Sequence, residues 1–292
     1  MHFQNWLIGT TIYATSEGFD VAKEKVLILV KTYPTLSNKY GELACTAGIR
    51  PDGSWIRLYP IKFRFLQDDQ KYRKYQWVEL DVHKNPKDPR PESFRPTNID
   101  DIQLGEIIDT GKSRDWAERR RLVVGQNTVY TDLADLIARA NSNQLSLAIF
   151  KPTKILDFIA MPADVDWSPE KVAAQLAMYN QPDLFDDGDT EEFTLMPKLP
   201  YKFSYRLSDI NGVESTMMVE DWEVGQLYWS CAQRYGESQA VEKVRQKYLD
   251  EFSQKDLHLF LGTTRQYHGW AKNPFVIIGT FHPPIEIQGS LL

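Results

Sequence analysis

The apolar run at positions 26–30, VLILV, constrains the fold more than any other stretch of this sequence. Side chains alternate between the two faces of a β-strand, so a strand without polar positions has both faces covered by other parts of the protein. Pro34, Ser37 and Asn38 follow it and are typical of a loop. We therefore expect a strand that is buried on both faces and ends in a loop.

A β-hairpin is predicted directly after this loop. Residues 42–49 and 54–59 are short runs of strand-forming residues, and the sequence RPDG at positions 50–53 separates them. Proline presets the backbone angle φ for a turn, and glycine accepts a positive φ at little steric cost. The sequence thus indicates two antiparallel strands joined by a tight turn.

The second strand of this hairpin has one polar, aromatic face. Trp55, Arg57 and Tyr59 share it, because side chains alternate along a strand. Flat rings that stack on bases and cations that bind phosphates are characteristic of proteins that bind single-stranded nucleic acid. Aromatic residues also favour strands for packing reasons, and arginine often covers their rings, so surface packing is the alternative. The same nucleic-acid hypothesis extends to five further basic residues, Lys62, Arg64, Arg90, Arg95 and Arg119.

The charge distribution favours a local basic surface over a uniformly basic protein. The chain of 292 residues has a formal net charge of −6, which argues against unspecific binding of nucleic acid over its whole surface. Residues 31–95, however, contain thirteen Lys and Arg against eight Asp and Glu. A groove that follows a phosphate backbone needs such a concentration of cations.

Composition and cysteine use point to a cytoplasmic protein. Hydrophobic residues make up 42% of the chain, and no apolar run is long enough to span a bilayer. The start, MHFQNWLIGT, lacks the charged and apolar segments of a secretory signal. The two cysteines, Cys45 and Cys231, form neither a disulfide framework nor a zinc motif. We expect no membrane association, no metal site and no cofactor.

Two groups of carboxylates keep a metal-dependent nuclease as an alternative. Glu79 and Asp81 share one face of a predicted strand and Lys84 follows, a pattern found where carboxylates hold a divalent cation. A solvated strand edge explains the same pattern. A second group lies at the start of a predicted helix, where acids also complement the helix dipole: Glu220, Asp221 and Glu223. Only this alternative requires Mg²⁺.

A loop near the C-terminus is a further candidate site. Residues 257–261 and 275–278 are apolar strands, and the sequence GTTRQYHGW lies between them. Functional loops are commonly mounted between buried strands in this way. Arg265 and His268 are candidates for an anion-binding pocket, with plain surface exposure as the competing explanation. The sequence contains no phosphate-binding loop, dinucleotide glycine motif or nucleophile elbow.

Residues 181–192, QPDLFDDGDTEE, contain six acidic residues and no basic one, so we expect a solvated linker. Gln181, Leu184 and Phe185 resemble the short peptide by which bacterial polymerases and repair proteins dock onto the sliding clamp. In those peptides the Gln hydrogen-bonds at one edge and the Leu-Phe pair fills an apolar cleft. Pro182 departs from the pattern, because an apolar residue is usual there. Packing of the Leu-Phe pair on the protein's own surface is the alternative.

The remaining sequence predicts helices and short strands. Residues 200–207 and 213–219 indicate a hairpin with an Asn-Gly turn. Helices are expected at residues 133–140, 169–179, 220–235 and 238–252.

Several segments, KTYPTLSNKYGE, CTAG, WIRLYP, LHLFLGTT and FHPP, resemble an uncharacterised prokaryotic protein family of this length. Its members carry Cys and His in the hairpin at residues 200–219, which implies a metal knuckle. In this chain Asp209, Asn211 and Gly212 occupy the turn, so no zinc is expected.

Short, irregularly spaced strands and scarce βαβ alternation predict an α+β fold. Residues 1–180 are expected to form a β-rich domain with a small barrel of the kind that binds nucleic acid. Residues 181–198 would be an acidic linker, and residues 199–292 a smaller domain with a β-hairpin and two helices. The leading hypothesis is a nucleic-acid-binding accessory protein in DNA processing, repair or defence, tethered to a partner such as a sliding clamp. A metal-dependent nuclease and a scaffold that binds only protein are the alternatives.

Overall fold

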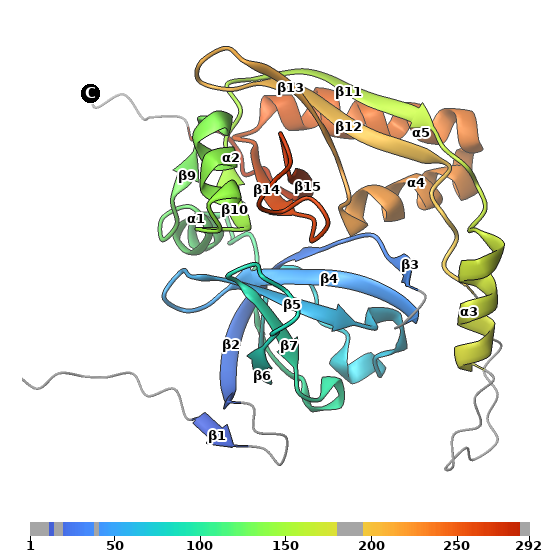
Figure 1. The fold of residues 1–292 in the computed structure, drawn as a ribbon. Coiled ribbons are helices and arrows are strands. Elements are labelled where there is room, and N and C mark those ends of the chain that lie inside the picture. The colour runs from blue at the N-terminus through green and yellow to red at the C-terminus, as the bar shows by residue number, and fades with distance from the viewer. Residues whose placement is uncertain (1–11, 15–19, 38–40, 180–194, 287–292) are drawn as a thin grey trace, which may run out of the picture.

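The first half of the chain folds into a small closed barrel (Figure 1). The structure is a computed structural model that describes residues 12–14, 20–37, 41–179 and 195–286. Five strands form the barrel: β2 (Asp20–Lys31), β4 (Gly41–Ile49), β5 (Trp55–Ile61), β6 (Gln76–Lys84) and β7 (Ser93–Pro96). They pair in the order β2-β4-β5-β7-β6, and β6 pairs with β2 to close the sheet. Three short strands extend the edges: β1 (Ile12–Ala14), β3 (Thr35–Ser37) and β8 (Gln103–Ile107).

The predicted hairpin forms two neighbouring barrel strands, β4 and β5. Gly53 in the turn has a φ of 85°, which glycine adopts without strain. The side chain of Asp52 accepts a hydrogen bond from the backbone N–H of Ser54 at 2.9 Å, and Ile49 pairs with Trp55. The turn chemistry that the sequence displays therefore sets the alignment of these strands.

Strand β2 contributes to two separate cores. Val26 and Ile28 belong to the apolar cluster inside the barrel, whereas Leu27, Leu29 and Val30 belong to a second cluster, between the barrel and the rest of the chain. All five side chains are at most 1% exposed. The prediction of a strand buried on both faces is confirmed, because each face of β2 meets a different layer.

The second half adds two sheets and most of the helices, which lie over one side of the barrel (Figure 1). One sheet contains β9 (Val129–Tyr130), β10 (Leu147–Phe150), β14 (His258–Thr263) and β15 (Phe275–Phe281), in the order β15-β14-β10-β9. The other contains β11 (Lys154–Pro162), β12 (Tyr201–Ser208) and β13 (Glu214–Met218). Strands β12 and β13 are the predicted second hairpin.

The described residues include five α-helices: α1 (Ala117–Val123), α2 (Leu133–Asn141), α3 (Pro169–Tyr179), α4 (Trp222–Tyr235) and α5 (Glu237–Arg245). Helix α3 contacts β3 and β4 of the barrel half. A π-helical segment, Gln246–Glu251, continues α5. Four 3-10 turns complete the described helices: Phe63–Phe65, Asp68–Gln70, Ile99–Asp101 and Phe252–Gln254. Asp132 and Asp221 cap α2 and α4, because each carboxylate accepts hydrogen bonds from backbone N–H groups of the first turn.

The predicted fold class, α+β with a small N-terminal barrel, is confirmed. Strand β10 pairs with β14, and β11 pairs with β12, so residues 147–162 share their sheets with residues 201–263. The predicted domain limits, 1–180 and 199–292, cut both sheets, because pairing between distant segments leaves no local signal in the sequence. Among the described residues, no helix has the length and apolar character needed to cross a membrane.

Candidate functional site

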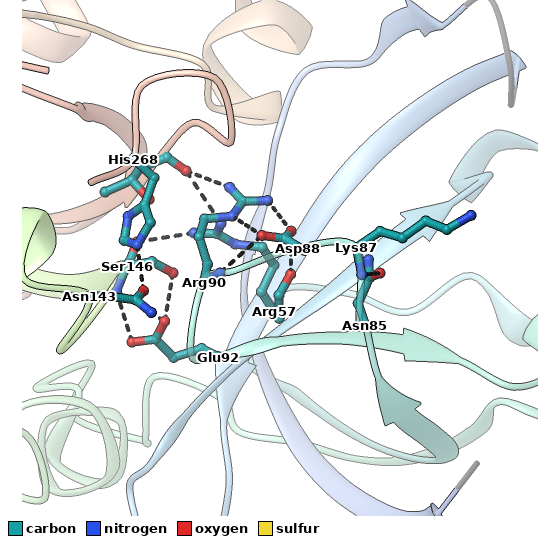
Figure 2. A network of polar contacts seen from close by, with 11 residues as sticks. Arg57, Asn85, Lys87, Asp88, Arg90, Glu92, Asn143, Ser146 and His268 are labelled. Atoms are coloured by element: carbon teal, nitrogen blue, oxygen red, sulfur yellow. Dashed lines mark hydrogen bonds and ion pairs between the residues drawn. The ribbon is translucent and has the colours of Figure 1, made fainter. Parts of the chain in front are cut away.

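Two buried arginines hold the barrel against the second half (Figure 2). Arg57 on β5 is 1% exposed and donates hydrogen bonds to the carbonyl oxygens of Ser146 at 3.0 Å and Thr263 at 3.3 Å. Arg90 is also buried and donates to the carbonyl oxygen of Thr263 at 2.6 Å. We call this arrangement, together with Asp88, Glu92 and Ser93, the clasp.

Asp88 is the carboxylate of the clasp that pairs with Arg90. Its carboxylate accepts two hydrogen bonds from the guanidinium of Arg90, at 2.8 and 2.6 Å, one from the backbone N–H of Arg90 at 3.2 Å, and one from the hydroxyl of Ser93 at 2.6 Å. Burial raises the pKa of Asp88, but these hydrogen bonds outweigh it and hold the pKa well below its ordinary value. Burial and the charge of Arg90 lower the pKa of Arg57 to about 10. The guanidinium group of Arg57 thus stays charged at neutral pH.

The clasp changes the interpretation of the aromatic face of β5. Glu92 extends it by accepting hydrogen bonds from the backbone N–H and hydroxyl of Ser146. Trp55 packs edge-on against Phe260 of β14, with 5.8 Å between ring centroids. The face that carries Trp55 and Arg57 therefore packs against the second half, and Arg57 and Arg90 do not reach the surface as phosphate ligands. Their burial follows from contacts with segments that lie far away in the sequence.

The other predicted basic residues are not gathered at one place with Arg57 and Arg90. Arg64 donates to the carboxylate of Glu42 at 2.6 Å, and Arg119 lies over the ring of Tyr75 at 3.9 Å. The remaining residues of the predicted set are Tyr59 and Arg95, both partly buried, and Lys62, which is exposed.

His268 anchors the loop in which the sequence predicted an anion site. It is buried, and its ring nitrogens share hydrogen bonds with the hydroxyl of Thr263 at 3.0 Å and the side-chain oxygen of Asn143 at 2.7 Å. Burial and the nearby charges of Arg90 and Arg57 lower the pKa of His268. The neutral ring therefore fixes the loop to the clasp and to the segment after α2, while Arg265 is exposed to solvent.

Above this anchor, residues 264–274 form what we call the aromatic loop. Trp270 is 67% exposed and Tyr267 is 43% exposed, with their ring centroids 5.7 Å apart. Arg265 and Lys272 are exposed on the same loop, which contains no Asp or Glu. The loop thus presents two large rings and two cations to solvent.

The backbone of the aromatic loop is held in place by hydrogen bonds. The N–H groups of His268 and Ala271 donate to the carbonyl oxygens of Thr264 and Tyr267, at 3.0 and 3.1 Å. Asn141 donates to the carbonyl oxygen of Ala271 at 3.3 Å, and the indole N–H of Trp270 donates to Gln266 at 2.8 Å. The exposure of Trp270 is therefore a property of an anchored loop.

A second candidate site is a cavity of about 450 Å³ where the barrel meets α4, the π-helical segment and the end of β15. We call it the junction pocket. It is lined by Lys31, Arg73, Lys74, Asp221, Trp222, Glu223, Gln226, Leu227, Lys247, Tyr248, Phe252 and His282. Concave sites with a few convergent polar groups on aromatic walls are typical of small-molecule binding.

Charged groups of the junction pocket have shifted pKa values, as is common at functional sites. Burial lowers the pKa of Lys31 to about 8, and that of His282 to about 3. Burial raises the pKa of Asp221 to about 7. Burial also lowers the pKa of Lys74, but the carboxylate of Glu223, 2.6 Å from its ammonium, outweighs this effect and raises it.

Sequence reasoning missed the cations of this pocket. Lys31 ends the apolar run of β2, and Lys74 lies between Arg73 and Tyr75 in the sequence, yet only the fold brings them beside His282. The sequence does contain one indication of the role of Lys31, because this lysine directly follows the fully apolar run at residues 26–30. Asp221 and Glu223, which the nuclease alternative named, do lie in this pocket.

The carboxylates of the nuclease alternative form no metal centre in the described ranges, where no group of three or more His, Cys, Asp and Glu side chains could hold an ion. The carboxylate of Glu79 lies 3.8 Å from the ammonium of Lys23 and 4.0 Å from that of Lys25. Glu79 and Asp81 both line a polar depression in the surface. The clamp-binding residues that the sequence suggested, Gln181, Leu184 and Phe185, lie outside the described residues.

Fold and site together define a two-part α+β protein whose barrel is clasped to a helix-rich second half. Residues 126–291 match the family model described as Domain of unknown function (DUF8757), and the chain belongs to this family. Residues 22–125, which include the barrel, match a second model, Domain of unknown function (DUF8758). The prediction that the chain belongs to an uncharacterised family is thus confirmed, since both models describe domains of unknown function. A comparison with curated proteins finds no match.

Proposed function

We propose that the protein binds single-stranded nucleic acid through the aromatic loop. The supporting observation is the pair of exposed rings, Trp270 and Tyr267, between two exposed cations, Arg265 and Lys272. Aromatic rings stack on bases of any sequence, and cations beside them contact the phosphate backbone. The proposal keeps the predicted ligand class but moves the contact surface from β5 to the loop between β14 and β15.

The local charge of the aromatic loop supports this ligand class. The whole chain has a formal net charge of −6, yet residues 257–284 contain no acidic residue. An acidic protein with a basic, aromatic surface loop repels polyanions elsewhere and attracts them at one place. Exposure of two large rings on an anchored loop leaves apolar surface in water, which is typical of interaction sites.

The cellular role belongs to the same proposal. The exposed rings would stack on bases of any sequence, which is suitable for a nucleic-acid-binding accessory protein in DNA processing, repair or defence. Tethering to a sliding clamp through Leu184 and Phe185 rests on the resemblance of residues 181–185 alone. Loss of clamp pull-down in the double variant Leu184→Ala, Phe185→Ala, with unchanged thermal stability, tests it, and retained pull-down contradicts it.

Fluorescence anisotropy with labelled single-stranded DNA, single-stranded RNA and duplexes tests the binding proposal. The double variant Trp270→Ala, Tyr267→Ala should bind single strands at least tenfold more weakly, since stacking contributes about 1–3 kcal/mol per base. Tyr235→Ala, which removes an exposed ring from α4, is the matched control and should bind like the wild type. Equal affinity of the loop variant and the wild type would overturn the proposal.

Salt dependence separates phosphate contacts from other binding. Replacement of Arg265 and Lys272 by alanine should weaken binding. The slope of log K against log salt concentration should become shallower by the amount that corresponds to about two phosphate contacts. Running the probe on a gel after incubation with and without Mg²⁺ tests the nuclease alternative at the same time. Cleavage that requires the metal would favour that alternative.

A further inference from the structure

The junction pocket is separate from the aromatic loop. Strands β14 and β15 form a hairpin whose connecting loop is the aromatic loop, whereas His282 follows Phe281 at the opposite end of β15. The two sites share no residue, so each can be removed without changing the other.

Cations dominate the pocket. Lys31, Arg73, Lys74 and Lys247 line it, against only two carboxylates, Asp221 and Glu223. Lys74 is already satisfied, because its ammonium donates to Glu223 at 2.6 Å and to the carbonyl oxygen of Thr280 at 2.9 Å. Glu223 is therefore already paired with Lys74, and Asp221 is the other carboxylate of the lining.

The ammonium of Lys31 has aromatic rings beside it in place of a paired carboxylate. It lies 4.0 Å from the ring centroid of Phe63 and 5.4 Å from that of Trp222, and its hydrogen bond to the carbonyl oxygen of Tyr72 is long, at 3.4 Å. Within the described part of the chain, it has no carboxylate within 4.0 Å. An anionic group that entered the pocket would supply the partner that Lys31 lacks.

Flat rings form the walls beside these cations. His282 stacks on Phe252 with 3.9 Å between ring centroids and 19° between planes, and Trp222 lies edge-on to Phe63 of the barrel half with 5.4 Å between ring centroids. Because burial lowers the pKa of His282 to about 3, its ring is neutral at physiological pH. Neutral rings of this kind favour a flat, unsaturated ligand.

One buried acceptor of the lining has no partner. Asp221 is 2% exposed, and its Oδ1 accepts from the backbone N–H of Glu223, but its Oδ2 has no hydrogen-bond partner. A buried polar atom without a partner is unfavourable by about 1–3 kcal/mol. A ligand with an N–H or O–H group would satisfy it.

We propose that the junction pocket binds a nucleoside phosphate. The phosphate lies between Lys31 and Arg73, the base lies along Trp222 and Phe252, and an N–H or hydroxyl group of the ligand donates to Asp221. The pocket volume of about 450 Å³ is within the range of small-molecule sites. Two sources carry this chemistry, a free mononucleotide and the phosphorylated end of a nucleic-acid strand.

Isothermal titration calorimetry of the full chain tests the site. Adenosine and guanosine 5′-monophosphates should bind at least tenfold more tightly than the matching nucleosides or inorganic phosphate. Lys31→Met should lose at least tenfold in affinity, and it should fold, because methionine fills the apolar cage around the ammonium. Lys25→Met is the matched control on the same strand, where the lysine lies over Trp77 outside the pocket, and should bind like the wild type.

Strands with a 5′-phosphate or a 5′-hydroxyl distinguish the two sources. In the Trp270→Ala, Tyr267→Ala background, tighter binding of the phosphorylated strand assigns the pocket to strand ends, whereas binding of mononucleotides alone assigns it to free nucleotides. If neither mononucleotides nor 5′-phosphates bind in a Lys31-dependent way, the proposal is refuted. Binding by the aromatic loop is measured with 5′-hydroxyl strands and succeeds or fails independently.

Discussion

Arg57 and Arg90 donate hydrogen bonds to the same atom, the carbonyl oxygen of Thr263. Two buried guanidinium groups therefore lie close together, and Asp88 is the carboxylate that pairs with one of them, Arg90, at 2.6 Å. Such an arrangement stabilises the fold only while all its members are present, because the loss of one leaves an uncompensated buried charge.

Replacement of Asp88 should therefore be strongly destabilising. Asp88→Ala leaves Arg57 and Arg90 buried beside each other, and we expect the free energy of unfolding to fall by about 3–5 kcal/mol, measured by urea titration. Asp68→Ala is the control, since that carboxylate is exposed beside Lys71 and its loss should leave the free energy of unfolding nearly unchanged. Similar losses in both variants would contradict this role.

Acid should weaken the clasp in a defined range. The folded pKa of Asp88 lies below its unfolded value of about 4, so its contribution to stability is present above that value and is lost as pH falls towards the folded pKa. The stability difference between wild type and Asp88→Ala should accordingly shrink below about pH 4. A constant difference down to pH 3 would speak against it.

Asp221 should have the opposite pH dependence. Its folded pKa of about 7 lies above the unfolded value, so the folded protein binds more protons between about pH 4 and 7, and stability falls as pH rises through this window. Lys31, Lys74 and Glu223 are the charged groups that act on it. Asp221→Asn keeps a good N-cap residue and removes the ionisation.

We expect Asp221→Asn to raise the melting temperature at pH 8 by several degrees and to leave it nearly unchanged at pH 5. Differential scanning calorimetry at both pH values measures this. Asp69→Asn, at an exposed position, should show no such difference. Destabilisation by Asp221→Asn at both pH values would show that the carboxylate is needed in its charged form.

Gly225 in α4 should not tolerate a side chain. A Cβ atom there would lie 2.1 Å from Cδ2 of Tyr33, which is held by hydrogen bonds to Trp229 and to the carbonyl oxygen of Pro197. Alanine is ordinarily the better helix former by about 1 kcal/mol, yet we expect Gly225→Ala to lose about 1–3 kcal/mol of stability by overpacking. Thermal unfolding checks this, with Ser230→Ala on the exposed side of α4 as the control.

His268 should control the aromatic loop through its two hydrogen bonds. His268→Ala is expected to speed amide hydrogen exchange in residues 264–274 and to weaken binding of single-stranded probes severalfold, while the rings themselves are unchanged. Asn143→Ala removes one of the two partners, so its effect and that of His268→Ala should not add. Full additivity would show that the two residues act separately.

Strands could be predicted from the sequence where the pattern of apolar residues or the turn chemistry is local. The run at residues 26–30 indicated burial on both sides, and the structure explains it, since Val26 and Ile28 face the barrel while Leu27 and Leu29 face the second half. The RPDG turn likewise indicated a hairpin because its geometry depends only on neighbouring residues.

The candidate sites were harder to predict because burial of a charge depends on distant segments. Alternation along β5 placed Trp55 and Arg57 on one face, but Thr263 and Ser146, which cover Arg57, lie far away in the chain. An arginine in a buried clasp and an arginine on a nucleic-acid surface have the same local sequence. For the same reason no local sequence pattern predicts the junction pocket, because its lining comes from five separate segments of the chain.

The double role of β2 has a consequence for folding cooperativity. A chain cut after residue 125, where one family model ends and the other begins, would expose the Leu27, Leu29 and Val30 face to water. In the intact chain, unfolding of either half would remove part of the apolar cluster that the other half shares. The border between the two matched models is thus a border in the sequence, and we expect that it does not divide the molecule into independent folding units.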